Sequence, residues 1–400
     1  MPRHSAVARL RPAPNPSLVL AGIAMSIATG FNILLPVVPV LTERSGPHGA
    51  AGAATAALFV GAVAGELLTP WLMSRWSSSR LLVTGQLVTA LPSLAYVLPH
   101  ADAWLMLSAA AARGLGMGVA IVVSVVLVGE LAAPHRRGRS IGYFSFALTA
   151  PGIVVPSVGI ALLEAGHVEL DALIAFAIGT AGALLAFYLP SPATTTHEAS
   201  YNLLAAFRRP GLAMIFAGFV LVSSSFGAVI TFVPIALPAA GISSAAVFLF
   251  VAGAVRAASR WLAGVLGDRR QGRLVLGASI GLTFLGLVAL ATRANPAVII
   301  FAAIAFGAGY GAVQTAAYLA LTAYGSTAHR HNISALWNAG IDLGSSLGGS
   351  LLGLAAARYG YGAAIWAIPA VVLIALPFVL APAGVEPATP LVEPAGAMGP

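Results

Sequence analysis

Five ionisable side chains interrupt long apolar runs of the 400-residue sequence: Glu66, Arg113, Arg256, Arg260 and Asp342. A charged group near the centre of a lipid bilayer costs about 3 kcal/mol, so it needs a partner, an aqueous cavity or a functional role. In such surroundings a carboxylate can take up and release a proton, and a guanidinium can hold an anion or pair with an acid. These five residues are therefore the first candidates for chemistry.

Asp342 and Arg256 both lie near the middle of their apolar runs, so the sequence places them at similar depth. Two interpretations remain open. Asp342 exchanges a proton while Arg256 approaches and leaves, or the two form a permanent structural ion pair.

Glu66 and Arg113 differ in their surroundings. Glu66 lies closer to the end of its run, which favours a bond to a neighbouring helix or to interfacial water over a proton site. Arg113 has no acid within one helical turn, which favours a cation that faces an aqueous cavity over a packing role. The residues predicted to take part in proton exchange are Asp342, Glu66, Arg113 and Arg256.

Polar and aromatic residues at mid-depth form a second group of candidates. Taken singly, each is explained by helix packing or by a hydrogen bond between helices. As a set they indicate an amphipathic or apolar ligand held by few polar groups. The predicted substrate-binding residues are Phe31, Asn32, Phe226, Tyr310, Gln314, Tyr318, Trp337 and Asn338.

The composition requires lipid as the main solvent of the helices that position these residues. The chain is 59% hydrophobic and 8% charged, whereas about a quarter of the residues in soluble domains are charged. A membrane-spanning helix needs about 20 apolar residues. Twelve such spans are expected, at Ser17–Leu41, Gly49–Met73, Arg80–Pro99, Asp102–Val128, Gly138–Leu163, Leu170–Leu189, Gly211–Leu237, Ser243–Gly267, Gly272–Thr292, Pro296–Thr322, Asn332–Arg358 and Gly360–Pro382.

The arginines support this count and give an orientation. Loops on the side of the N-terminus contain 14 of the 20 arginines, and loops on the other side contain Arg44, Arg293 and Arg358. Because arginine is enriched in short cytoplasmic loops, both termini are expected to be cytoplasmic in a multi-pass protein of the cell (inner) membrane. Arginines spread over many loops form no single basic patch, so no nucleic-acid partner is expected.

The two halves of the chain repeat each other. Arg113–Gly118 matches Phe306–Gly311, which begins 193 residues later. Internal symmetry of this kind is typical of transporter folds. The expected organisation is an N-terminal six-helix bundle at 1–189, a cytoplasmic linker at 190–210, and a C-terminal six-helix bundle with a short cytoplasmic tail at 211–400.

One loop motif carries a family resemblance. Gly264-Val-Leu266-Gly-Asp268-Arg269-Arg-Gln-Gly272-Arg273 resembles the G-x-L-x-D-R-x-G-R signature of the major facilitator superfamily, with one extra residue before the glycine. The matching loop of the first half has Ser74 where the signature has Asp. Arg113–Gly118 resembles the arginine-and-glycine element of the family's fourth helix, and Ala147–Pro151 resembles its antiporter motif with Ala150 in place of Gly.

The resemblance implies an all-α integral membrane protein of the major facilitator fold, with 12 transmembrane helices in two pseudo-symmetric six-helix bundles. It favours the drug and metabolite efflux branch, in which the arginine of the fourth helix is tied to proton coupling. It also implies a charge network that locks the two halves on the cytoplasmic side, here formed by Arg75, Glu130, Asp268, Arg269 and Arg273.

The expected function is export of a small amphipathic or lipophilic drug or metabolite in exchange for protons, by alternating access. Proton-coupled nutrient uptake, flipping of a lipid or lipid-linked substrate, and a membrane sensor remain as alternatives. An enzyme is not expected, because there is no credible nucleophile, phosphate loop or metal-ligand set, and no cysteine. The expected partners are a small-molecule substrate, protons and the lipid bilayer, with no cofactor and no metal, in a monomer.

Overall fold

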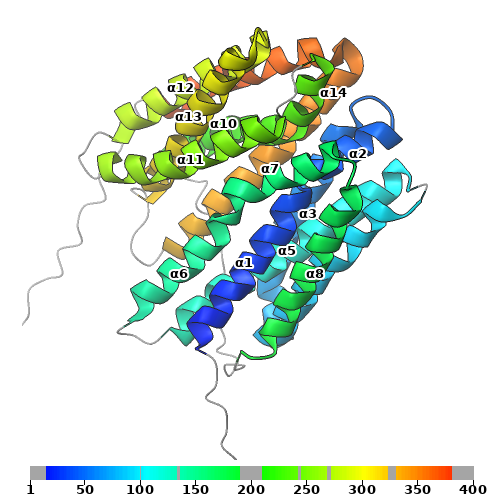
Figure 1. The fold of residues 1–400 in the computed structure, drawn as a ribbon. Helices are drawn as coiled ribbons and strands as arrows, with labels where there is room; N and C mark the ends of the chain where they lie inside the picture. Colours follow the sequence, from blue (N-terminus) through cyan, green and yellow to red (C-terminus); the bar gives the residue numbers. More distant parts are fainter. Residues whose placement is uncertain are drawn as a thin grey trace, which may run out of the picture.

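The computed structural model of the chain describes residues 15–99, 101–132, 136–189, 210–241, 245–267, 272–322 and 330–380. Nearly all of these residues are helical, and the helices form two groups that follow the order of the sequence (Figure 1). The expected linker lies almost entirely outside the described residues, so its boundaries stay a prediction.

The first group contains the helices before the expected linker. Two of its expected spans are divided by proline, which lacks an N–H donor and clashes with the preceding helical turn: the first at Pro36 and the fifth at Pro151. The helices are α1 (Pro16–Leu34), α2 (Val37–Ser45), α3 (Ala50–Met73), α4 (Ser78–Ala90), the 3₁₀ helix η1 (Leu91–Val97), α5 (Ala103–Leu131), α6 (Arg137–Thr149), α7 (Pro151–Glu164) and α8 (Val168–Ala186).

The second group contains α10 (Pro210–Ala239), α11 (Ala245–Gly267), α12 (Gly272–Thr292), α13 (Pro296–Thr322) and α14 (Arg330–Leu380). In the described residues, 11 helical segments are long and apolar enough to cross a membrane. One of them, Leu336–Phe378, has 43 residues, about twice the length that one crossing needs. It is broken at Gly360, whose φ of 75° suits a residue without Cβ. The segment therefore accounts for the last two expected spans, and the twelve-helix fold is confirmed.

The helices place two sets of turns at opposite ends of the molecule. We call the end where α1 begins the amino-terminal face, and the end that contains the turn before α3 the opposite face. Ser17 and Ser140 share a hydrogen bond of 2.7 Å at the amino-terminal face. At the opposite face the rings of His48 and Tyr361 lie 6.5 Å apart, which brings the first half against the second.

Glycines allow α3 of the first half to pack directly on α14 of the second. A Cβ added to Gly52 would overlap the carbonyl oxygen of Gly349, and one added to Gly49 would overlap that of Gly353. Close to this crossing the hydroxyls of Thr55 and Thr231 share a hydrogen bond of 2.6 Å between α3 and α10. The halves are thus closed together at the opposite face.

A second contact between the halves lies between α7 and α11, which run side by side in Figure 1. A Cβ added to Gly253 of α11 would lie 3.0 Å from the carbonyl oxygen of Ile153 and 3.2 Å from that of Gly152. The α3–α14 and α7–α11 contacts are the two walls along which the halves meet, and the candidate residues gather on both.

Candidate functional site

The α3–α14 wall contains two carboxylates, one from each half. Glu66 on α3 is half-buried and Asp342 on α14 is 9% exposed, and their charges lie within electrostatic reach of each other. In the described part of the chain, neither residue has an ion pair within 4.0 Å. We call Glu66 and Asp342 the acid pair.

Small residues fix the position of Glu66. A Cβ at Gly65 would overlap the carbonyl oxygen of Leu115, and one at Gly118 would lie 2.9 Å from the Glu66 backbone nitrogen. The backbones of α3 and α5 therefore touch at this level, which fixes the part of α3 that carries Glu66. The sequence favoured a bond to a neighbouring helix or to interfacial water for Glu66, and the structure places Glu66 on α3, which packs against the helix α14 that carries Asp342.

The α7–α11 wall contains two arginines, one helical turn apart on α11. The Cζ atom of Arg256 lies 5.0 Å from the ring centroid of Phe226, and its Nη2 donates a hydrogen bond of 3.3 Å to the carbonyl oxygen of Gly152. The Cζ atom of Arg260 lies 5.5 Å from the ring centroid of Trp337. Both side chains are half-buried. We call Arg256 and Arg260 the arginine pair.

The arginine pair has no ion pair with a carboxylate within 4.0 Å among the described residues. The pairing of Arg256 with Asp342 expected from the sequence is therefore not formed in this conformation. Instead Arg256 crosses to the first half through Gly152, and a Cβ at Gly152 would lie 3.3 Å from its Nη2 and 3.8 Å from the Oδ1 of Asn32. Arg256 and Asn32 thus approach one glycine from different halves.

Aromatic side chains of the second half support the arginines. The ring of Tyr310 stacks between Phe226 and Phe306, with centroid distances of 5.4 and 5.7 Å. Trp337 stacks on Phe219 at 6.3 Å, and its Nε1 donates a hydrogen bond of 2.8 Å to the carbonyl oxygen of Gln314.

The structure therefore brings five of the predicted substrate-binding residues together around the arginine pair. They are Phe226, Tyr310, Gln314, Tyr318 and Trp337. Tyr310 is fully buried, so it holds Phe226 in place and does not itself face a ligand.

The remaining predicted binding residues lie around the same interface. Phe31 packs edge-on against Phe59 at 6.1 Å. The Nδ2 of Asn32 donates a hydrogen bond of 2.7 Å to the carbonyl oxygen of Ala28, which leaves its Oδ1 directed toward Gly152. Asn338 is half-buried one turn before Asp342 on α14.

Arg113 is enclosed by the first half. It is 1% exposed, and its Nη2 donates a hydrogen bond of 2.8 Å to the carbonyl oxygen of Gly30 on α1. Its Cζ lies 5.8 Å from the ring centroid of Tyr96 on η1. The sequence favoured a cation in an aqueous cavity, whereas in this conformation Arg113 ties α5 to α1.

The predicted conformational lock is only partly described. Asp268 and Arg269 lie outside the described residues, as does the side chain of Arg273. Arg75 is exposed in the turn after α3, with its Cζ 4.2 Å from the ring centroid of Trp71 on α3. Glu130 is also exposed, near the end of α5. The lock stays a prediction.

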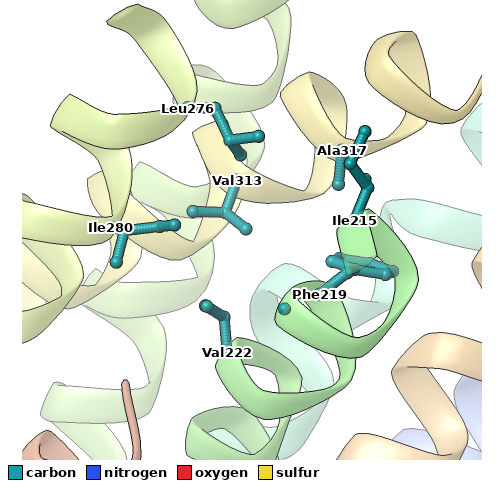
Figure 2. Close-up of a pocket in the computed structure, with 8 residues that line it drawn as sticks. Ile215, Phe219, Val222, Leu276, Ile280, Val313 and Ala317 are labelled. Carbon is teal, nitrogen blue, oxygen red and sulfur yellow. The ribbon is translucent and has the colours of Figure 1, made fainter. Parts of the chain in front are cut away.

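A hollow inside the second half is purely apolar (Figure 2). It has no room for a water molecule, so it cannot hold a polar substrate in this conformation. Its lining residues are Ile215, Gly218, Phe219, Val222, Leu276, Ile280, Val313 and Ala317.

Reasoning from the sequence left two features of the site without a role. Arg260 was not assigned a role, although a second arginine four residues after Arg256 in an apolar run was a visible signal. The residue type alone could not identify Gly152 as part of the site, because the chain contains 44 glycines. In the described residues, no group of three His, Asp or Glu side chains could hold a metal ion.

Two bundles of apolar helices, with ionisable groups on the helices that pack where the bundles meet, are typical of a membrane transport protein. The sequence profile of the Major Facilitator Superfamily matches residues 20–331. The chain belongs to that superfamily, as the loop motif indicated, and is therefore a transporter and not an enzyme. No curated protein matches the chain in sequence.

Solved structures share the fold at low sequence identity. The nucleoside transporter NupG aligns with a TM-score of 0.73 and 13% identity, over 92% of this chain and 98% of that one. A bacterial homolog of the human lysosomal transporter Spinster, in an inward-facing and unoccupied conformation, gives 0.70 and 16%, over 92% and 97%. The human organic anion transporter TETRAN gives 0.62 and 14%, over 92% and 100%. These likenesses establish the fold alone.

Proposed function

We propose that the chain exports a small amphipathic or lipophilic molecule in exchange for protons, by alternating access. The observation that carries this proposal is the acid pair: Glu66 and Asp342 come from different halves, lie within electrostatic reach of each other, and have no ion pair within 4.0 Å in the described part of the chain. The fold does not identify the substrate, because the aligned structures include a nucleoside transporter and an organic anion transporter.

The acid pair links protons to the movement of the halves. In an effective dielectric of about 20, two like charges about 4 Å apart repel each other by about 4 kcal/mol, and the repulsion falls in inverse proportion to the distance. When both carboxylates are ionised, this repulsion opposes contact between α3 and α14 at their level. One bound proton removes it, so proton binding and release shift the balance between conformations.

The membrane potential can drive this cycle. A proton that enters the cell releases about 2.3 kcal/mol per 100 mV, and the pH gradient adds to that. The arginine distribution supports cytoplasmic termini in the cell membrane. In this orientation the amino-terminal face is cytoplasmic and the closed opposite face is external.

A second candidate is proton-coupled symport of an anion, which the arginine pair favours. An anion at Arg256 and a proton on the acid pair attract each other, so each raises the affinity of the protein for the other. Symport depends on this positive coupling between the two ligands, whereas antiport requires that binding of one ligand displaces the other. Proton movement measured together with substrate movement separates the two candidates.

The test uses proteoliposomes with an acidic interior and a panel of lipophilic cations, antibiotics, aromatic acids and sugars. Antiport predicts that an added substrate releases protons from the vesicles, and that Asp342→Asn and Glu66→Gln each abolish the release. Glu169→Gln is the matched control, because Glu169 is an exposed carboxylate at the start of α8. Proton release that persists in both acid-pair variants would refute the coupling role. Protons that move in the same direction as the substrate would replace antiport with symport.

A further inference from the structure

The arginine pair is an unneutralised positive site inside the membrane region. Arg256 and Arg260 lie four residues apart and therefore share a face of α11. An arginine near mid-depth, as Arg256 is, costs about 3 kcal/mol, and in the described residues no carboxylate within 4.0 Å of either arginine offsets such a cost. A purely structural role would be served by one arginine paired with an acid. Two adjacent cations without such a partner point to a ligand that supplies the negative charge.

The aromatic rings hold both guanidinium groups in place. Arg256 lies over Phe226 and Arg260 over Trp337, at 5.0 and 5.5 Å from the ring centroids. The rings are themselves fixed, Phe226 by the stack with Tyr310 and Trp337 by its hydrogen bond to Gln314. Side chains that are ordered before a ligand arrives lose less entropy when it binds, which raises affinity.

The backbone of α11 is fixed in the same way. A Cβ at Gly311 of α13 would overlap the carbonyl oxygen of Arg256, and one at Gly307 would overlap the backbone of Ala252. The hydroxyl of Thr315 donates a hydrogen bond of 3.1 Å to the carbonyl oxygen of Arg260. Each arginine is therefore anchored to α13 through its own backbone.

The site also reaches the first half. Arg256 uses one donor on the carbonyl oxygen of Gly152, and a guanidinium has five donors. Because Gly152 has no side chain, Arg256 and Asn32 both approach this point. Both arginines are half-buried, so a ligand can reach them. A ligand bound here touches both halves, as alternating access requires.

We infer that the arginine pair binds the anionic group of the substrate, and that the substrate is an amphipathic organic anion. The planar guanidinium fork suits a carboxylate or a phosphate, with two parallel N–H···O bonds. The rings of Phe226 and Trp337 accept the apolar part of the same molecule. The amide of Asn32, on the first half, offers a polar contact to it. This assignment rests on the proposed transport function in naming the ligand as the substrate, and an anionic substrate favours the symport candidate over antiport. The anion comes from a soluble aromatic acid or from an anionic lipid headgroup.

Equilibrium binding without a proton gradient tests the inference separately from proton coupling. The purified chain in zwitterionic nanodiscs is titrated with an aromatic carboxylate, its neutral amide and an aromatic amine of the same size. We expect the carboxylate to bind, and Arg256→Gln and Arg260→Gln each to weaken it about tenfold or more. The amide and the amine are expected to bind far more weakly and to be unaffected. Arg358→Gln is the matched control, because Arg358 lies over Tyr359, with its Cζ 5.8 Å from the ring centroid, but is exposed at the opposite face.

A second arm identifies the source of the anion. Nanodiscs that contain phosphatidylglycerol are compared with zwitterionic ones, using a fluorescent phosphatidylglycerol as probe. Binding of this probe that depends on both arginines, with no binding of the soluble acid, assigns the site to a lipid headgroup; the reverse assigns it to a soluble anion. Arg256→Lys keeps the charge and guards against misfolding of Arg256→Gln. Unchanged affinity for both anions in every arginine variant overturns the inference.

Discussion

The α3–α14 crossing at the opposite face gives the sharpest prediction. Gly52 lies against the carbonyl oxygen of Gly349, where a Cβ would overlap that oxygen. Gly52→Ala must therefore push the two helices apart. Overpacking of a close contact costs about 1–3 kcal/mol, and loss of the nearby hydrogen bond between Thr55 and Thr231 costs about 1 kcal/mol more. A total of about 2–4 kcal/mol lowers the ratio of closed to open conformations by about 30- to 900-fold.

The chain has no cysteine, so introduced cysteines report without background. His48 and Tyr361 come from different halves, and their rings lie 6.5 Å apart at the opposite face. In the variant His48→Cys with Tyr361→Cys, a short bifunctional thiol reagent should join the two cysteines readily when this face is closed. Adding Gly52→Ala should slow this crosslinking in proportion to the loss of the closed conformation, and the rate is read from gel mobility.

Gly281→Ala is the matched control, because a Cβ at Gly281 meets nothing within 4 Å. Alanine is the better helix former by about 1 kcal/mol, so this control should leave crosslinking unchanged and raise thermal stability slightly. Equal crosslinking rates in folded Gly52→Ala and Gly281→Ala would show that the glycine contact does not hold the face closed, and would refute the reasoning.

Three further predictions concern the walls and the first half. Arg113→Gln should destabilise the purified protein by about 1.5–3 kcal/mol, because the bond to Gly30 is lost in a buried site; an unchanged melting temperature would contradict this. Gly152→Ala should weaken binding of an aromatic carboxylate several-fold by pressing on Arg256, while the acid pair still couples protons; unaltered affinity would argue against the site. Trp337→Phe should lower stability by about 1 kcal/mol through loss of its hydrogen bond, and equal stability would count against it.

Reasoning from the sequence was most successful for the lengths and ends of the helices. The expected spans Gly272–Thr292 and Pro296–Thr322 coincide with α12 and α13. The length of an apolar run is a local property, and bilayer thickness sets how much of it is needed. The divisions at Pro36 and Pro151 followed from proline chemistry but were not predicted.

The sequence also determined which residues lie at depth and are chemically unusual. Glu66, Arg113, Arg256, Arg260 and Asp342 were identified from their charge within apolar runs alone. Placing a charged side chain inside an apolar membrane span costs free energy whichever neighbours its helix has, so its presence points to a role before any fold is known.

Only the tertiary structure decided which of these residues meet. Asp342 lies near Glu66 and not within ion-pair distance of Arg256, and Arg113 bonds to Gly30 instead of facing a cavity. Hydropathy fixes the depth of a residue along its helix, but not the rotation of the helix about its axis or the angle at which it crosses its neighbours. Those depend on close backbone contacts at particular glycines, such as Gly52 on Gly349, which join segments far apart in the sequence.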